Sequence, residues 1–198
     1  MLRMTNTIRL VDWVKLLIKG LKKVDKDGLW CIIKLEKTKK GKENMIRRAE
    51  ERDIYYINKL LYQVLEVHHK GRPDLFKSNA KKYTDEQLKE IIHDDNSPIF
   101  VFDDDGEIKG YVFCMILQTQ NHNIFVDRKT LYIDDLCVDE NCRAQGVGKA
   151  LYQFAENFAK KIGCYNLTLN VWSCNQNALK FYEMQGLVPQ KTNMEKIF

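Results

Sequence analysis

Residues 142–151, with the sequence CRAQGVGKAL, have the types and spacing to hold a phosphate group. Gly146 and Gly148 lie between residues 130–140, which are typical of a strand, and residues 148–163, which are typical of an amphipathic helix. Glycines at such a junction allow a tight turn, and the free N–H groups at the start of a helix can bind an anion. A tight turn without a ligand is the alternative.

Two common phosphate-binding motifs do not fit this stretch. A P-loop requires glycine at position 143 and Ser or Thr at 150, where the chain has Arg143 and Ala150. A dinucleotide-binding loop requires a third glycine at 151, which is Leu151, and an acidic residue near the end of the next strand, where Asn170 lies. The stretch could still bind the diphosphate of another kind of ligand.

Two carboxylates and a phenol could carry acid–base chemistry. Asp134 and Asp135 lie in the middle of a predicted strand, where carboxylates fit poorly unless they are used. Neighbouring strand residues point to opposite faces, so both can face one site only if a bulge intervenes. Tyr182 is a phenol that is protonated at pH 7, so it can act as an acid. The alternatives are carboxylates that cap backbone groups and a tyrosine of the core.

The elements that must position these residues follow from periodicity and turn signals. Helical spacing of apolar residues predicts helices over 54–69 and 83–95, the second with Thr84 as N-cap and Gln87 as its capping-box partner. β-branched and aromatic runs around a D-D-G turn predict a hairpin over 98–117. Further along the chain we expect a strand at 130–140, a helix at 148–163, a strand at 166–172, a helix at 175–186 and one or two closing strands at 187–198.

The chain resembles the GNAT acyltransferase superfamily. The R-x-x-G-x-G spacing at 143–148 is similar to the family's acetyl-CoA loop, and NQNALKFYEMQG at 175–186 resembles its Asn-x-x-Ala-x-x-x-Tyr helix. The similarity covers residues 45–198. It implies an α/β (mixed α+β) fold, in which a central, mostly antiparallel sheet splays between its fourth and fifth strands and is flanked by helices.

The resemblance implies that acetyl-CoA is the co-substrate and that no metal is needed. Its diphosphate would lie on the N–H groups of residues 145–149, and its pantetheine arm along the strand before them, with Asn175 on the far side. The implied cofactor residues are Leu136, Cys137, Val138, Arg143, Ala144, Gln145, Gly146, Val147, Gly148, Lys149 and Asn175. Ala144 replaces a glycine that many members have, which would matter if a positive φ is required there.

The implied activity is N-acetyl transfer from acetyl-CoA directly to a primary amine. Tyr182 would protonate the leaving thiolate, Asp134 would be the base through water, and Asp135 would orient the amine, as a Glu-Asp pair does in similar polyamine acetyltransferases. His69, beside His68, is a candidate for contact with the acceptor. A polyamine, an aminoglycoside and a peptide N-terminus stay open as acceptors, and a homodimer is compatible with this family. The alternative function is a non-catalytic module that binds acyl-CoA or a partner.

Composition and charge exclude several other classes. The six cysteines form no C-x-x-C pair and the four histidines no zinc spacing, so we expect reduced, buried thiols in a cytoplasmic protein and no metal. Residues 45–198 hold 20 Lys and Arg against 22 Asp and Glu, which argues against a nucleic-acid partner. No apolar run is long enough to span a membrane, and no secretion signal is recognisable.

The basic excess lies in residues 1–44, with 12 Lys and Arg against 5 Asp and Glu. We expect this extension to be dispensable for the fold and for activity, with the domain starting at Met45. Residues 8–21 could form a basic amphipathic helix for a membrane surface or a partner. Alternatively, the purine-rich codons required by KKGKEN, residues 39–44, could be a bacterial ribosome-binding site, so that translation starts at Met45.

Overall fold

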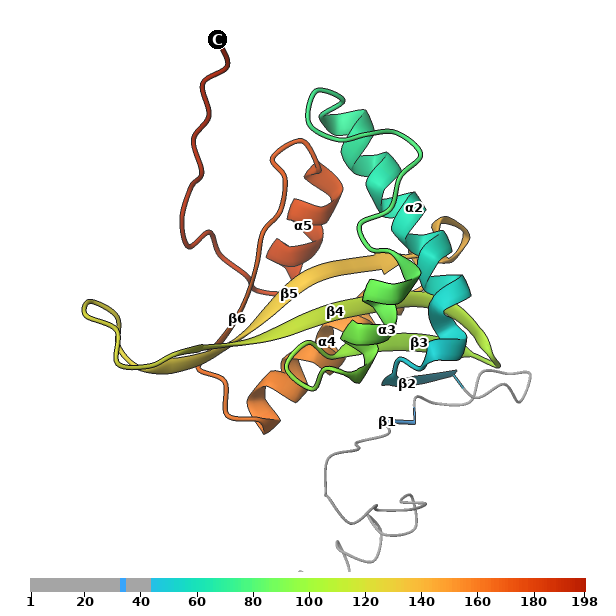
Figure 1. Ribbon diagram of the computed structural model, residues 1–198, viewed down its shortest axis with the longest axis horizontal. Helices are drawn as coiled ribbons and strands as arrows, with labels where there is room; N and C mark the ends of the chain where they lie inside the picture. Colours follow the sequence, from blue (N-terminus) through green and yellow to red (C-terminus); the bar gives the residue numbers. More distant parts are fainter. Residues whose placement is uncertain (1–32, 35–43) are drawn as a thin grey trace, which may run out of the picture. The chain divides into compact units, whose positions relative to one another are not determined.

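The computed structural model describes residues 33–34 and 44–198. Six strands in these residues form one sheet in the order of the chain (Figure 1). Neighbouring strands are antiparallel except for the last pair, which is parallel. The predicted mixed, mostly antiparallel sheet is therefore confirmed. The strands are β1 (Ile33–Lys34), β2 (Asn44–Arg48), β3 (Ile99–Asp104), β4 (Glu107–Thr119), β5 (Arg128–Val138) and β6 (Asn166–Leu169).

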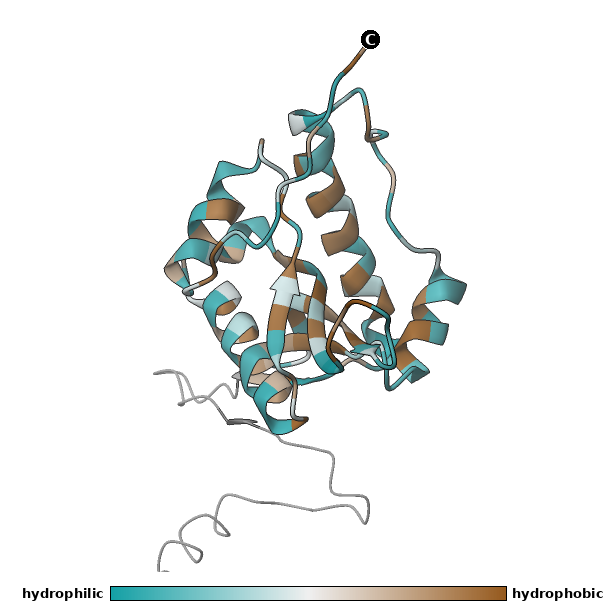
Figure 2. Ribbon diagram, turned by 90° about the vertical axis from the view of Figure 1, so that its left-hand side faces the viewer, coloured by the Kyte–Doolittle hydropathy of each residue, from teal (hydrophilic) through white to brown (hydrophobic). Residues whose placement is uncertain are grey.

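Helices cover both faces of the sheet, and each face has its own hydrophobic cluster. α2 (Ile54–Gly71) and α3 (Asp85–His93) bury their apolar sides on one face, where Leu60, Leu88 and Tyr111 are fully buried. α4 (Val147–Lys161) packs on the other face through residues such as Leu151, and α5 (Gln176–Met184) adds Phe181 and Tyr182 to that cluster. Short 3-10 helices, η1 (Glu51–Asp53) and η2 (Glu140–Cys142), precede α2 and α4. The apolar sides of the helices face the sheet in Figure 2.

Local sequence signals account for most of these boundaries. The predicted capping box is present, since the Thr84 side chain accepts from the Gln87 N–H at 3.2 Å and the Gln87 side chain accepts from the Thr84 N–H at 2.9 Å. The β3–β4 turn holds Asp105 and Gly106 at positive φ, as a tight hairpin turn requires. The predicted hairpin and helices are therefore confirmed.

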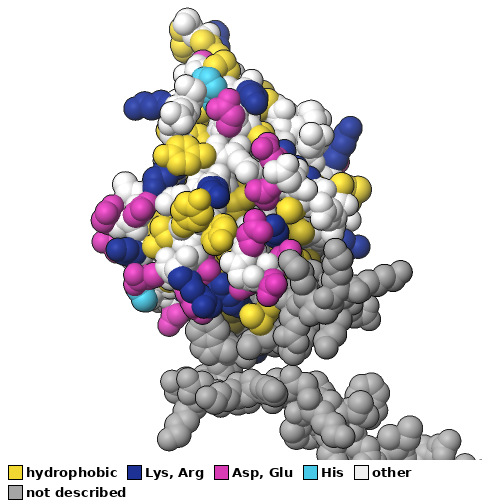
Figure 3. Space-filling view, turned by 90° about the vertical axis from the view of Figure 1, so that its right-hand side faces the viewer, with side chains coloured by type: hydrophobic (Ala, Val, Ile, Leu, Met, Phe, Trp, Pro, Cys, Tyr) yellow, Lys and Arg dark blue, Asp and Glu magenta, His cyan; other side chains and the backbone are white. Residues whose placement is uncertain are grey.

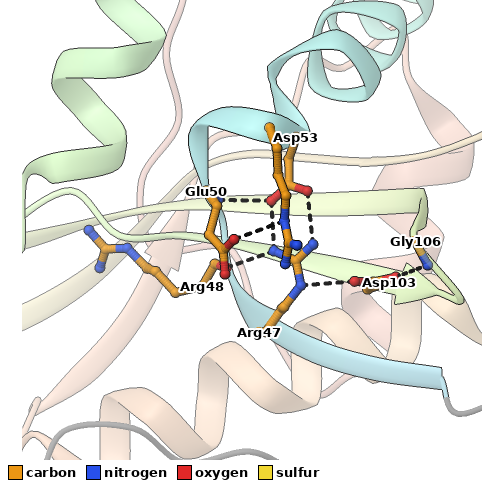
Figure 4. Close-up of polar contacts among 7 residues, drawn as sticks. Arg47, Arg48, Glu50, Asp53, Asp103 and Gly106 are labelled. Carbon is orange, nitrogen blue, oxygen red and sulfur yellow. Dashed lines mark hydrogen bonds and ion pairs between the residues drawn. The ribbon is translucent and has the colours of Figure 1, made fainter.

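A buried ion-pair network holds β2 in its place in the sheet (Figure 4). The Arg47 guanidinium donates to both carboxylate oxygens of Asp53, at 2.7 and 2.8 Å, and to Asp103 at 2.9 Å. Asp103 also accepts from the Gly106 N–H at 2.7 Å. The Asp53 carboxylate is the main cause of the raised pKa of Arg47. One arginine thus ties β2, η1 and the β3–β4 turn together.

The sheet opens between β5 and β6. Parallel pairing runs from Thr130 with Asn166 to Ile133 with Leu169, and residues 134–138 of β5 have no partner in β6. The strand predicted at 166–172 therefore ends early, at Leu169. This opening is the splay expected between the fourth and fifth strands of the resembled fold, here β5 and β6.

The predicted closing strands at 187–198 are wrong. This segment has no regular structure, and Val188, Met194, Ile197 and Phe198 are exposed. It leaves the end of α5 as an extended tail (Figure 1) and contacts the end of α2 through Arg72, which donates to Glu195 at 2.8 and 3.0 Å. Its β-branched residues, Val188, Thr192 and Ile197, are separated by Pro189 and by polar and charged residues, so its strand propensity is low.

Three other expectations concern the cysteines, the N-terminal extension and membrane-spanning segments. The five described cysteines are free thiols, but only Cys114 and Cys137 are buried, and Cys174 is exposed, so burial was wrongly predicted for Cys174. Ile33 and Lys34 of the N-terminal extension pair with β2, whereas the predicted helix at 8–21 lies outside the described residues. No helix in the described part of the chain is long and apolar enough to cross a membrane.

Candidate functional site

A β-bulge places two carboxylates on one face of β5. Phe113 of β4 pairs with Asp135 and the next residue, Cys114, pairs with Ile133, so Asp134 has no partner across the ladder. The side chains of Leu131, Ile133 and Leu136 pack on the α4 face. Asp134 and Asp135 instead contact tyrosines of the α2–α3 face. The bulge required by the sequence analysis is present, and both carboxylates share one site.

Asp135 is bonded to a tyrosine, and its carboxyl has a raised pKa. Its side chain accepts a hydrogen bond from the Tyr111 hydroxyl at 2.8 Å. Burial raises the pKa of the Asp135 carboxyl to about 6, although this hydrogen bond opposes the shift. Burial, followed by the charge of Asp135, also raises the pKa of the Tyr111 phenol. Asp135 therefore titrates close to neutral pH and Tyr111 stays a donor.

Asp134 is held by two residues that the sequence analysis missed. The Tyr83 hydroxyl donates to Asp134 Oδ2 at 2.6 Å, and Lys82 Nζ donates to the same oxygen at 2.7 Å. Tyr83 stacks on Phe113 with 5.6 Å between ring centroids and 10° between planes. Burial, then the bond to Asp134, raises the pKa of the Tyr83 phenol. No spacing in the sequence signals these contacts, because Lys82 and Tyr83 lie in the connection before α3.

Tyr182 reaches the same region from α5, on the other side of the opening. Its ring packs near Phe181 and Tyr152, with centroid distances of 5.1 and 6.4 Å. Burial raises the pKa of the Tyr182 phenol, and the next cause is the charge of Asp135. Its hydroxyl has no hydrogen-bond partner among the described residues. Tyr182 is thus a protonated phenol that senses the charge of Asp135.

The loop before α4 presents unused backbone N–H groups. Gly146 is the N-cap of α4 with φ of 86°, and an added Cβ there would meet no atom within 4 Å. The Ala150 N–H donates to the Gly146 carbonyl at 2.9 Å, so the N–H groups of residues 147–149 precede the first helical bond. Arg143, Gln145 and Lys149 are exposed around them. The geometry suits a bound anion.

Ala144 has a φ of 59°, in the left-handed region that favours glycine. The sequence analysis named this conformation as the one in which alanine would differ from glycine. The loop does require a positive φ at this position, so its backbone is strained at Ala144.

Leu136, Cys137 and Val138 line the opened part of β5. Leu136 and Val138 pack toward α4, whereas the Cys137 thiol lies under α2 and contacts the Leu60 carbonyl at 3.5 Å. Burial raises the pKa of this thiol. The backbone edge of these three residues that faces away from β4 has no partner strand, so an extended ligand can hydrogen-bond along it.

Asn175 begins α5 and borders a cavity of about 340 Å³ between α2 and α5. Its side chain accepts from the Ala178 N–H at 3.1 Å, so it is an N-cap. His68 lines this cavity, and burial, then the charge of Lys82, lowers the pKa of its imidazole. The other lining residues are Val67, Lys70, Gly71, Trp172, Cys174, Gln176 and Asn177.

His69 does not line this cavity. Its Nδ1 lies 2.7 Å from the Phe76 carbonyl, which fixes the connection between α2 and α3. The ring of Phe76 packs against Trp172 and His68, at centroid distances of 5.2 and 5.1 Å. Of the two neighbouring histidines, His68 is therefore the one exposed to the cavity, while His69 supports the wall beside it.

Other ligand classes have less support in the described part of the chain. No group of three His, Cys, Asp or Glu side chains could hold a metal ion there. The face of the molecule in Figure 3 carries basic and acidic side chains interspersed with one another. The features that converge are the carboxylate pair, the phenol, the open strand edge and the helix N-terminus.

Comparisons with known proteins point to one family. The sequence model described as "Acetyltransferase (GNAT) family" matches residues 61–187. An uncharacterised N-acetyltransferase of Bacillus subtilis (strain 168) is 30% identical over 144 residues, covering 71% of this chain and 87% of that protein. An uncharacterised N-acetyltransferase of Lactobacillus delbrueckii subsp. lactis is 31% identical over 114 residues, which span 58% of this chain and 65% of that protein.

Solved structures show the same fold. The X-ray structure of a tetramutant of a Bacillus halodurans protein is 33% identical and superposes with a TM-score of 0.74. The similarity covers 77% of this chain and 99% of that one.

Proposed function

We propose, because this chain belongs to the acetyltransferase (GNAT) family, that it transfers the acetyl group of acetyl-CoA directly to a primary amine. The observation that carries the proposal is the β-bulge at Asp134. It brings two carboxylates to the point where β5 and β6 separate, and the charge of one of them, Asp135, adds to burial in raising the pKa of the Tyr182 phenol. Base, acid and an open strand edge then converge on one place.

In the proposed complex, the chain binds acetyl-CoA without a metal. The N–H groups of residues 145–149, at the positive end of the α4 dipole, bind the diphosphate, and Arg143 adds charge at the entrance. Leu136, Cys137 and Val138 bind the pantetheine amides along the open strand edge, with Asn175 opposite. A solved aminoglycoside N-acetyltransferase of this fold, 16% identical with a TM-score of 0.59, is in complex with CoA.

The proposed chemistry divides between the two sides of the opening. Asp134 takes a proton from the acceptor ammonium through water, and the neutral amine then attacks the acetyl carbonyl carbon. Asp135, ionised above a pH of about 6, orients the cationic acceptor. Tyr182 donates its proton to the sulfur as the carbon–sulfur bond breaks, and the second proton of the attacking nitrogen returns to the Tyr182 phenolate through water. Tyr83 and Tyr111 are positioning residues that hold the two carboxylates.

The proposed acceptor is a cationic amine, because a paired carboxylate site attracts positive charge. Polyamines, aminoglycosides and peptide N-termini fit this description. A relative from Arabidopsis thaliana named glucosamine 6-phosphate N-acetyltransferase, 31% identical over 109 residues, adds amino sugars to the set.

The test is release of free thiol from acetyl-CoA across a panel of these amines. We expect turnover with at least one cationic amine and loss of turnover in Asp134→Asn. Tight acetyl-CoA binding with no turnover on any amine would instead favour a non-catalytic acyl-CoA-binding module.

The binding loop is tested by calorimetry with acetyl-CoA on Arg143→Ala/Gly146→Asp. This double variant should lose most of its affinity, because a carboxylate then lies where the diphosphate binds. Gly163→Asp is the matched control, since Gly163 also has a positive φ of 74° but lies at the opposite end of α4. Unchanged affinity in a folded double variant would contradict the proposed loop.

A further inference from the structure

A primary amine of the chain itself already contacts the carboxylate proposed as the base. Lys82 Nζ donates to Asp134 Oδ2 at 2.7 Å. The Lys82 side chain is 44% exposed and the Asp134 side chain 16%. The ε-ammonium of Lys82 therefore occupies the position in which the cationic group of an acceptor would meet Asp134.

The neighbours of Lys82 fix its backbone beside Asp134. On one side, Tyr83 is stacked on Phe113 and bonded to Asp134, and the capping box of Thr84 follows at once. On the other side, Lys81 turns away from the site and donates to Asp85 and Asn58. Only the second of these two adjacent lysines reaches the carboxylate.

Asp134 also lies where an acetyl group would arrive. It follows Ile133, the last residue of β5 that pairs with β6, so it stands at the apex of the opening. An arm that binds along residues 136–138 extends toward this apex, since a strand rises about 3.3 Å per residue and Asp134 is two residues beyond Leu136. The proposed thioester and the Lys82 amine therefore meet at the same carboxylate.

We propose that Lys82 is a site of self-acetylation by acetyl-CoA, an inference that rests on the proposed function. Asp134 takes a proton from the Lys82 ammonium, and the neutral nitrogen forms a bond to the acetyl carbon. As the carbon–sulfur bond breaks, the thiolate takes the Tyr182 proton. The nitrogen releases its second proton to the Tyr182 phenolate through water, and acetyl-Lys82 and free CoA are formed. The modification removes the positive charge of Lys82, so Asp134 becomes available to an external cationic amine.

The experiment incubates the full chain with isotopically labelled acetyl-CoA and no acceptor, and follows acetylated peptides by mass spectrometry. Lys81 is the internal control, because it has the same side chain one residue away and points elsewhere. We expect label on Lys82 at least tenfold faster than on Lys81, at a rate per molecule that does not change with protein concentration. Lys82→Arg removes the label, and Asp134→Asn brings the two lysines to similar rates.

Three outcomes overturn the inference. If the chain acetylates a free amine but labels Lys82 no faster than Lys81, the result contradicts self-acetylation and agrees with the proposed function. A Lys82 rate that rises with protein concentration shows transfer between molecules and excludes the intramolecular step. Absence of label on Lys82 together with absence of turnover on every amine contradicts both proposals. Circular dichroism of Asp134→Asn shows whether a lost preference reflects chemistry or unfolding.

Discussion

At the scale of single residues, the site depends on one strand residue that has no partner. Because Asp134 is the extra residue of the bulge, it turns to the same face as Asp135. The sequence identified both carboxylates as unusual for a strand, but their common face could not be predicted. A bulge is set by the register of β4 against β5, which is a property of the pair of strands.

The contacts of Lys82 and Tyr83 were unpredictable for a similar reason. Both reach Asp134 across about 50 residues of sequence. Their positions follow from how the connection before α3 lies over the sheet, and neither residue has a distinctive local pattern. By contrast, the R-x-x-G-x-G spacing is local, so the sequence located the helix N-terminus and its loop correctly.

Asp135→Asn should change how stability depends on pH. The pKa of this carboxyl is about 6 in the folded chain and 3.8 as its ordinary value, so the folded chain binds the extra proton between these pH values. Stability from this group is therefore present below about pH 4 and is lost as the pH rises to 6. Relative to the unchanged protein, Asp135→Asn should gain up to about 3 kcal/mol between pH 4 and 7.

Urea unfolding at pH 4, 5, 6 and 7 measures this gain. Asp95→Asn is the control for loss of an exposed carboxylate, since the Asp95 side chain is 89% exposed. A stability difference that stays constant with pH would show that Asp135 does not have its raised pKa.

Tyr182→Phe should lower kcat about 10²–10⁴-fold with little change in acetyl-CoA affinity, because the ring stays and only the acidic proton is lost. Steady-state kinetics on the amine found in the panel measures kcat, and calorimetry measures affinity. Tyr165→Phe is the matched control, since Tyr165 is 78% exposed. A Tyr182→Phe enzyme with most of its kcat would identify Tyr182 as a packing residue.

At the scale of elements, local rules were sufficient wherever an element carries its own signals. α3 begins at its capping box, α4 is followed by Gly163 and α5 by Gly186, both glycines at positive φ. The strand prediction at 187–198 was wrong because this segment lacks such signals: Pro189 and polar or charged residues separate its few β-branched residues.

Ala144→Gly should stabilise the fold by about 0.5–1 kcal/mol. Alanine at a φ of 59° costs roughly 1–2 kcal/mol, and the added freedom of glycine in the unfolded chain cancels part of the gain. Urea unfolding should show a higher midpoint with an unchanged slope. Ala150→Gly, inside α4, is the opposite control and should destabilise by about 1 kcal/mol. An equal decrease in the free energy of unfolding in both variants would mean that Ala144 is not strained.

At the scale of the whole molecule, the sequence predicted the sheet, its layers and the place where it opens. The resemblance to the GNAT superfamily carried the position of the opening, because that fold splays between its fourth and fifth strands. The length of the pairing between β5 and β6 was not predicted, since apolar residues continue past Leu169 as Val171 and Trp172 while the strand does not.

Residues 45–198 expressed alone should fold and bind acetyl-CoA. Both hydrophobic clusters are built from residues 46–187, and every proposed site residue lies within that range. The shorter chain loses the two-residue pairing of β1 with β2, so we expect a small decrease in melting temperature. Circular dichroism and calorimetry, with the full chain as control, measure both properties. An insoluble or non-binding product would show that residues 1–44 are needed.

The position of Tyr182 on the last helix has a consequence for synthesis. Asp134, Asp135 and their tyrosine partners all precede the loop proposed to bind the diphosphate, and Tyr182 comes roughly 50 residues after Asp135. At about 5–20 residues per second, a ribosome adds Tyr182 some 2–10 s after the carboxylates. A nascent chain therefore contains both carboxylates several seconds before it contains the phenol that we propose as the acid.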